Sequence, residues 1–246
     1  MPLANRSLRA LALVTLFGAG AYGVACARSK DGNAAPAVDA SPKSPRGAAA
    51  AGTTSGTTAS TGGGTDSVSQ RADRARIQGD GSARVWIVEI SDFQCPYCRM
   101  WHDSTYRTLV REYVESGKAR LAYVNFPLPS HHNAWPAAEA AMCSGVQGKF
   151  WGMHDRLFDT QPTWAALADP TAFFDSLATA AGVDAVRMRA CVTSHATRPL
   201  IQADVDRATA AGINSTPNFI IGDQPIVGAQ PIEAFRRAID AALEKK

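Results

Sequence analysis

The chain has 246 residues and a formal net charge of +3 at neutral pH. The positive excess lies in the first 70 residues, which carry six Lys and Arg against three Asp and Glu, while the remainder is balanced at nineteen of each sign. Nucleic-acid binding requires a clustered basic excess, so the balanced remainder excludes that class of partner. A unit of about 175 residues can bury a packed core without a structural metal or dense disulfides.

The N-terminus has the layout of a secretory signal. Arg6 and Arg9 precede an apolar stretch over residues 10–25, which is short for a membrane-spanning helix. The small residues around Cys26 fit a cleavage site, while residues 23–26 resemble a bacterial lipobox in which Gly replaces the usual Leu. Cys26 is therefore either removed with the signal or lipidated. We expect an exported protein, periplasmic or otherwise extracytoplasmic, that is membrane-tethered if Cys26 is lipidated or the signal stays uncleaved.

Residues 28–70 consist mainly of Ala, Gly, Ser, Thr and Pro, with almost no large apolar side chains. Such a segment cannot offset its own ordering entropy, and its composition is typical of a flexible linker. It would suit a domain held off a membrane, although a plain disordered spacer has the same composition. The predicted organisation is a signal peptide or lipoprotein signal over residues 1–27, a disordered linker over 28–70 and one folded domain over 71–246.

The folded part opens with a β-α-β pattern. A continuous apolar run within residues 84–90 predicts a central strand buried on both faces. A helix with apolar positions from Met100 to Val114 follows and ends at Gly117, and residues 119–126 predict the next strand. This order of elements is a β-α-β unit.

The C-terminal part predicts a β-β-α pattern, with strands over residues 218–221 and around 226–227 and a helix after Pro231. The roughly 90 residues between the two halves are too many for an ordinary connection. Their helical periods fall at about residues 134–146, 149–158, 170–181, 184–194 and 197–211. The predicted fold is α/β, a thioredoxin fold with a helical subdomain inserted at about residues 128–212.

The motif Cys95-Pro96-Tyr97-Cys98 stands between the first strand and its helix. Helix N-terminal amides favour an anion, so Cys95 is expected to have a lowered pKa and to be the attacking thiolate. Cys98, one turn deeper, can close a redox-active disulfide with it. The alternative is half of a zinc site with His102 as a third ligand, but zinc normally has four ligands and the chain has no second Cys-x-x-Cys. We expect neither a metal nor a cofactor.

Two carboxylates precede the motif, and one proline follows the insertion. Glu89 lies at the end of an apolar strand, where burial of a carboxylate is costly, and it could exchange protons with Cys98 or simply turn to solvent. Asp92 is a rival for the same role, but Glu89 is the preferred candidate. Thr216-Pro217 directly precedes a strand, and a plain trans turn would explain a proline at this position.

Several separated segments resemble the bacterial DsbA-like thiol-disulfide oxidoreductases in order: residues 90–98 (ISDFQCPYC), 125–128 (NFPL), 137–143 (AAEAAMC), 147–151 (QGKFW) and 215–217 (STP). The resemblance runs from about residue 85 to the C-terminus. It implies Cys95 as nucleophile, Cys98 as its partner, Glu89 at a buried acid position, and Pro217 as a cis proline after Thr216 that faces the pair. The Pro-Tyr dipeptide differs from the Pro-His of the strongest oxidants, which leaves the oxidising strength open.

The remaining cysteines, Cys143 and Cys191, lie in predicted helices among apolar residues. An export signal and an even count after Cys26 favour a structural disulfide between them over two buried free thiols. His131 and His132 are predicted to be solvated loop residues. The five tryptophans are predicted to serve packing, although Trp101 could border the active-site groove.

The predicted function is donation of the Cys95–Cys98 disulfide to cysteine-containing exported proteins, followed by reoxidation by a membrane or small-molecule redox partner. A reductase or isomerase would use the same pair, although no dimerisation domain for an isomerase is present and a monomer is expected. A copper metallochaperone would instead hold Cu(I) between the two thiols. A redox-silent scaffold would resist both oxidation and reduction.

Overall fold

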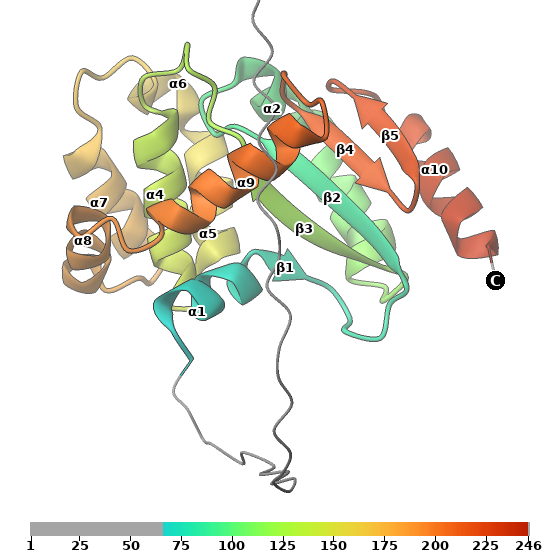
Figure 1. The fold of residues 1–246 in the computed structure, drawn as a ribbon, viewed down its shortest axis with the longest axis horizontal. Helices are drawn as coiled ribbons and strands as arrows, with labels where there is room; N and C mark the ends of the chain where they lie inside the picture. Colours follow the sequence, from blue (N-terminus) through green and yellow to red (C-terminus); the bar gives the residue numbers. More distant parts are fainter. Residues whose placement is uncertain (1–65, 246) are drawn as a thin grey trace, which may run out of the picture. The chain divides into compact units, whose positions relative to one another are not determined.

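The computed structural model describes residues 66–245, and its elements are arranged around one five-stranded sheet (Figure 1). The strand order is β1-β3-β2-β4-β5. The two central strands, β2 (Val85–Ser91) and β3 (Ala119–Asn125), are parallel. The other three strands are antiparallel to their neighbours. β4 (Asn218–Ile221) pairs with β2, β5 (Gln224–Val227) pairs with β4, and β1 (Ile77–Gln78) pairs with β3.

One face of the sheet is covered by the helical segment that follows β2 and by the C-terminal helix α10 (Ile232–Glu244). The segment after β2 comprises α2 (Pro96–Trp101), η1 (His102–Tyr106), α3 (Arg107–Leu109) and η2 (Val110–Val114), with η1 and η2 in π-helical geometry. Trp101 packs on Phe219 and Phe235 at ring-centroid distances of 4.6 and 5.7 Å. These aromatic contacts fix α2 against β4 and α10, so the start of α2 is held rigidly over the end of β2.

The residues between β3 and β4 form a helical insertion. Its helices are α4 (Ala134–Gly145), α5 (Phe150–Asp159), α6 (Gln161–Trp164), α7 (Thr171–Ala180), α8 (Ala185–Thr193) and α9 (Arg198–Ala210). Figure 1 shows α4 to α8 grouped beside the sheet, while α9 crosses its second face on the way back to β4. The architecture confirms the predicted thioredoxin fold with an inserted helical subdomain.

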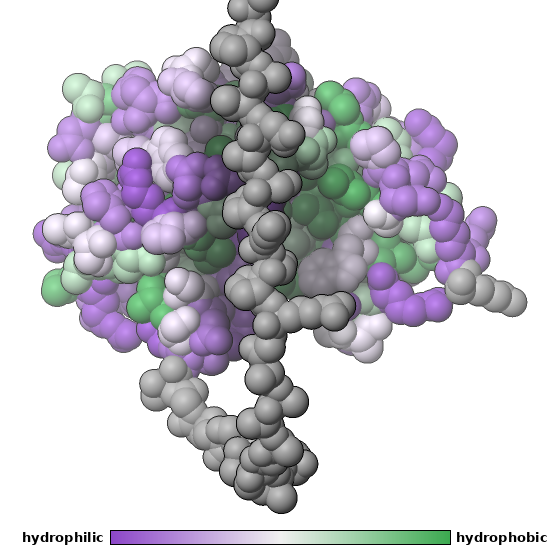
Figure 2. Space-filling model, in the orientation of Figure 1, coloured by the Kyte–Doolittle hydropathy of each residue, from purple (hydrophilic) through white to green (hydrophobic). Residues whose placement is uncertain are grey.

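The second face of the sheet is covered only in part. Ala208 of α9 packs with Ile90 and Phe126 in a small apolar cluster. Figure 2 shows apolar surface remaining beside α9 in the direction of β4 and β5, and Ile220 and Val227 of these strands are exposed. The deeper core therefore lies on the opposite face and in the insertion.

The N-terminal boundary of the fold differs from the prediction. α1 (Val68–Ala75) begins within the segment expected to be linker, so residues 68–70 are helical. Ser67 and Gln70 form a reciprocal capping box, which stabilises the first turn by satisfying otherwise unpaired amides. Arg76, directly after α1, forms a buried ion pair with Asp204 of α9. The expected signal over residues 1–27, including Cys26, and the linker up to residue 65 lie outside the described residues.

Asp204 is a junction between the insertion and the sheet. Its side chain is fully buried, and its Oδ2 accepts hydrogen bonds from the main-chain amide and the side-chain amide of Asn125, both at 3.1 Å, besides the Arg76 guanidinium. Burial of a carboxylate is tolerated here because charge and hydrogen bonds compensate it. Within residues 66–245 no helix combines the length and the apolar character needed to cross a bilayer.

Candidate active site

The two cysteines of the Cys-x-x-Cys motif lie where a buried strand passes into a helix. Cys95 is the N-cap of α2, with an extended backbone at φ −70° and ψ 123°, and Pro96 opens the first turn, where its missing N–H costs nothing. Cys98 lies three residues further along and is fully buried, whereas Cys95 is 3% exposed. Both are free thiols in this structure. One thiol therefore lies at the helix N-terminus and the other one turn deeper.

The two thiols have opposite acidities. A hydrogen bond from the Cys98 thiol, together with the backbone amides of Cys98 and Tyr97, outweighs burial and lowers the pKa of Cys95 to about 6. Burial, and then the hydrogen bond and charge of Cys95, raise the pKa of Cys98 well above its ordinary value. At neutral pH Cys95 is therefore a thiolate, while Cys98 keeps its proton.

The Thr216–Pro217 peptide bond is cis and faces the first thiol. In its protonated form the Cys95 thiol donates to the carbonyl oxygen of Thr216, with an Sγ–O distance of 3.5 Å. β4 starts directly afterwards at Asn218 and pairs with β2, which brings this turn beside the motif although 121 residues separate the two. The local sequence alone left a trans turn open, and the structure contains the cis form.

The two candidate carboxylates have different surroundings. Asp92 accepts hydrogen bonds from the amides of Gln94 at 2.7 Å and Leu128 at 2.9 Å, and its own carbonyl accepts one from the amide of Cys95 at 3.0 Å. Asp92 is therefore an anchor that shapes the turn before α2 and joins it to the loop after β3. Its oxygens are already engaged, which argues against a role in proton exchange.

Glu89 is the carboxylate without partners. Its side chain is fully buried, and neither oxygen accepts a well-formed hydrogen bond from the described residues, although the nearby Ser91 hydroxyl acts to lower its pKa. Burial raises the pKa of Glu89 to about 8, so it holds a proton at neutral pH. Burial, and then the charges of Glu89 and Cys98, raise the pKa of Tyr123. Glu89 is therefore the buried carboxyl of the two candidates that is protonated at neutral pH.

His131 is not the solvated loop residue that the sequence predicted. Its Nδ1 lies 2.6 Å from Oδ2 of Asp92, and only 21% of its side chain is exposed. The hydrogen bond to Asp92 raises the pKa of His131 despite partial burial, and the charge of Cys95 acts in the same direction. The loop after β3 therefore places an imidazole, hydrogen-bonded to Asp92, on the side of the motif. Its neighbour His132 is exposed, as expected.

The insertion supports the active-site turn through a residue that sequence reasoning missed. Gln161, at the start of α6, is 4% exposed, and its Nε2 donates to the carbonyl oxygens of Phe93 at 2.6 Å and Cys95 at 3.0 Å. Gln94 adds a second link, because its Oε1 accepts from the amide of Asn133 at 2.7 Å. No local sequence signal distinguishes Gln161 from a surface glutamine.

The alternative zinc site with His102 does not form. His102 is buried, and its Nε2 lies 3.4 Å from Asp155 and its Nδ1 3.5 Å from Asp103. Within residues 66–245, no group of three potential metal ligands includes either cysteine of the motif; the groups that occur are His102-His154-Asp155 and His102-Asp103-Asp159.

Two large apolar side chains are exposed on α2, the helix that begins after Cys95. Tyr97 is 62% exposed and Met100 48% exposed. Trp101, by contrast, is fully buried against the sheet, so it packs and does not border a groove. Tyr97 and Met100 therefore give the start of this helix an exposed apolar surface.

A disulfide joins Cys143 of α4 to Cys191 of α8, with a Cα–Cα distance of 5.8 Å. Cys143 is 1% exposed and packs with Ala178, Val183 and Met188. This bond lies in the insertion and is separate from the thiols of the motif.

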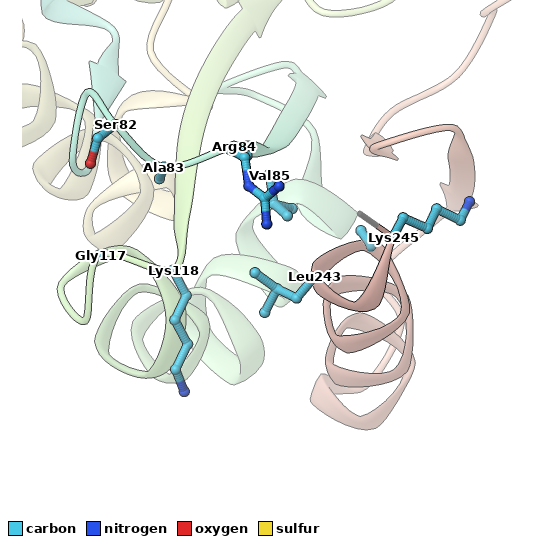
Figure 3. A pocket seen from close by; sticks show the side chains of 9 residues that line it. Ser82, Ala83, Arg84, Val85, Gly117, Lys118, Leu243 and Lys245 are labelled. Atoms are coloured by element: carbon cyan, nitrogen blue, oxygen red, sulfur yellow. The ribbon is translucent and has the colours of Figure 1, made fainter.

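A hollow of about 350 Å³ lies at the other end of the sheet (Figure 3). It is lined by the residues before and at the start of β2, by Gly117 and Lys118 before β3, and by the end of α10. Because β2 begins here and ends near the motif, about 20 Å separates the two regions at the rise of a strand. The hollow therefore takes no part in the chemistry of the thiols.

The fold and the thiol pair at the start of α2 define the class of thiol-disulfide oxidoreductases. A family model described as Thioredoxin matches residues 71–241. The chain belongs to this family, and its fold resembles that of DsbA proteins of known structure.

Three relatives show how far the similarity extends. The chain is 32% identical over 172 residues to Na(+)/H(+) antiporter NhaA 1 of Salinispora arenicola, covering 70% of this chain and 25% of that protein. It is 25% identical over 170 residues to the probable disulfide bond formation protein D of Bacillus anthracis, covering 68% of this chain and 77% of the relative. The crystal structure of oxidised BdbD from Bacillus subtilis superposes with a TM-score of 0.63 at 20% identity, covering 69% of this chain and 92% of that one. The chain thus spans about a quarter of the antiporter and most of the disulfide-forming relatives.

Proposed function

We propose that this protein donates the disulfide of Cys95 and Cys98 to cysteine pairs of exported proteins. The observation that carries the proposal is the opposite acidity of the two thiols. The pKa of Cys95 is lowered to about 6, so reduction leaves a stable thiolate at the N-terminus of α2. A stabilised reduced form favours loss of the disulfide to a substrate.

The reaction proceeds by two thiol-disulfide exchanges. A substrate thiolate attacks the Cys95 sulfur of the oxidised pair, the bond to Cys98 breaks, and Cys98 leaves as a thiolate that takes up a proton. A second substrate thiolate then attacks the substrate sulfur of the mixed disulfide, and Cys95 leaves as a thiolate. The substrate loses two electrons and the enzyme gains them. A membrane or small-molecule redox partner must remove these electrons before the next cycle.

The other site residues serve this exchange. Glu89 supplies the proton to the leaving Cys98, as its burial and its pKa of about 8 allow. Thr216 and the cis Pro217 border the reactive sulfur, so a substrate chain attached to Cys95 lies against this turn. Tyr97 and Met100 offer that chain an apolar contact.

Export agrees with this function. The predicted signal over residues 1–27 directs the chain out of the cytoplasm, either released by cleavage or tethered through Cys26. The disulfide between Cys143 and Cys191 supports an oxidising compartment, because such bonds are rare where thiols are kept reduced. Exported proteins with exposed cysteines are the substrates available there.

The reduction potential of the Cys95–Cys98 couple tests the direction of electron flow. We expect equilibration of the full chain with glutathione to give a value above about −200 mV, since values near −270 mV belong to a reductant such as thioredoxin. Oxidation of a reduced model substrate provides the second measurement, with Cys95→Ser expected to abolish it. A potential near −270 mV would assign the protein to the reductases instead.

A further inference from the structure

Several buried polar atoms without hydrogen-bond partners gather between the sheet and α5. In the described part of the chain they include both carboxylate oxygens of Glu89, the hydroxyl of Tyr123 and Nε2 of His154. Buried polar groups are nearly always hydrogen-bonded in native proteins, so a group of exceptions in one region calls for a functional explanation. A carboxyl, a phenol and an imidazole are also groups that exchange protons with one another.

These three side chains follow one another from the sheet into the insertion. Glu89 of β2 and Tyr123 of β3 are direct partners in the parallel register, so their side chains leave the sheet on the same face. The Tyr123 ring meets the ring of His154 edge-on at a centroid distance of 5.4 Å. Phe93 stacks on Tyr123 at 4.8 Å and lies against His154 at 5.8 Å, which closes this region to solvent from the side of the active-site turn.

His154 is fully buried, but its Nδ1 contacts a residue that reaches the surface. Nδ1 lies 2.8 Å from Oδ1 of Asp155, whose side chain is 43% exposed. Asp155 lines a surface hollow of about 240 Å³ together with Tyr106, Arg107 and Trp151. One ring nitrogen of His154 therefore faces the interior without a partner, while the other contacts a carboxylate that reaches solvent.

The charges around this path favour a mobile proton. Burial lowers the pKa of His154, so the ring is neutral at rest and has one nitrogen free to accept. Burial acts to raise the pKa of Asp155, but hydrogen bonds from His102 and His154 outweigh it and keep this carboxyl ionised. Several titratable or charged groups face His154 and Asp155. They are Glu89 and Tyr123 from the strands, His102, Asp103, Tyr106 and Arg107 from the segment after α2, and Asp159 from α5.

We propose that His154 and Asp155 form a proton path between solvent and Glu89, and that the catalytic cycle uses it in both directions. In the reduced protein the proton of the neutral His154 ring lies on Nδ1, which donates to Asp155, so the path first runs outward. During reoxidation Glu89 gives its proton to Nε2, the Nδ1 proton passes to Asp155 and then to solvent, and Glu89 takes the proton that Cys98 loses. One proton leaves and no electrons move along the path. When Cys98 next leaves as a thiolate, it takes a proton from Glu89, Glu89 takes one from Nε2, Nδ1 receives one from solvent through Asp155, and the starting tautomer of His154 is restored.

The inference rests on the proposed function, because it needs Cys98 to change its protonation in each cycle. Its test is a single-turnover reaction of the reduced full chain with excess glutathione disulfide. Attack by Cys95 forms a mixed disulfide, and attack by Cys98 then resolves it, which acid quenching and mass analysis can follow separately. Only the second step requires the proton of Cys98 to leave.

We expect His154→Gln to leave the first step unchanged and to slow the second at least about tenfold at neutral pH, with an altered pH profile and solvent deuterium isotope effect. Asp155→Asn, which changes a half-exposed group, is expected to slow the same step, and it decides the question if His154→Gln does not fold. His132→Asn is the matched control, since His132 is exposed and outside the path.

The outcomes separate the inference from the function on which it rests. If the wild type resolves the mixed disulfide and both path variants do so at the same rate with the same pH profile, the proton path is wrong while the function stands. If the wild type never resolves the mixed disulfide, the proposed function is wrong, and the proton path is wrong with it. An unchanged urea midpoint and an unchanged Cys95 titration in the slowed variants exclude a merely structural effect.

Discussion

The raised pKa of Glu89 makes the stability of the fold depend on pH. In the unfolded chain a glutamate ionises at about 4.5, while in the fold Glu89 keeps its proton up to about 8. The folded state therefore binds more protons between these values, and stability is lost as the pH rises through this window. Glu89→Gln, which resembles the protonated form and cannot ionise, removes this contribution.

The size of this loss of stability follows from the upward shift of the Glu89 pKa. Each pKa unit corresponds to about 1.36 kcal/mol, so full ionisation of Glu89 costs on the order of 5 kcal/mol of the free energy of unfolding. Between about pH 5 and about pH 8 the wild type should lose about 3 to 4 kcal/mol relative to Glu89→Gln. For a domain of this size the corresponding difference in Tm is on the order of 10 °C.

The assay is urea unfolding of the wild type and Glu89→Gln at several pH values, with the motif reduced and the other disulfide verified by thiol counting. Any constant cost of burying the glutamine amide cancels when the difference between the two proteins is followed against pH. Repeating the pair in a Cys95→Ser background removes the titration of the thiolate. A difference that stays constant within about 1 kcal/mol from pH 5 to pH 8 would refute the burial argument for Glu89.

Other consequences of the structure are open to measurement. Thiolate absorbance of the reduced protein should titrate near pH 6 and vanish in Cys95→Ser, and an ordinary thiol titration would contradict the assignment of the nucleophile. Cys98→Ser should accumulate mixed disulfides through Cys95, detectable by mass spectrometry, because the variant lacks the Cys98 thiol whose attack releases the partner bound to Cys95. Gln161→Met removes the donor from two buried carbonyls and should cost about 1 to 3 kcal/mol in urea unfolding and slow substrate oxidation; unchanged stability and rate would dismiss this support. Arg76→Met removes one of the two arginines paired with the buried carboxylate of Asp204, while Arg207 and Asn125 keep their contacts, and should cost about 1 to 3 kcal/mol in urea unfolding; unchanged stability would speak against the ion pair.

The fold could be predicted because its pattern is local. The apolar run at β2, the periodic helices of the insertion and the β-β-α order at the C-terminus each appear within a short window of sequence. α1 was missed because it is short and buries only Ala72, although Ser67 and Gln70 carry a recognisable capping box.

The site was only partly predictable. The spacing and helix position of Cys95 and Cys98 are visible in the sequence, and so is their chemistry. The roles of Glu89 and Asp92 depend on which carboxylate finds partners, and those partners come from segments far along the chain. The contact of His131 with Asp92 spans 39 residues, and a pattern of nearby residues carries no information on such a pairing. Long-range contacts therefore limit what the sequence alone can assign.

The disulfide of the insertion turns residues 143–191 into a closed covalent ring, and Gln161, which holds the carbonyl of Cys95, belongs to that ring. Because a cross-link lowers the entropy of the unfolded chain, the ring stabilises the insertion that carries Gln161. Reduction of this one bond is therefore expected to weaken the support of the active-site turn without touching the two thiols of the motif.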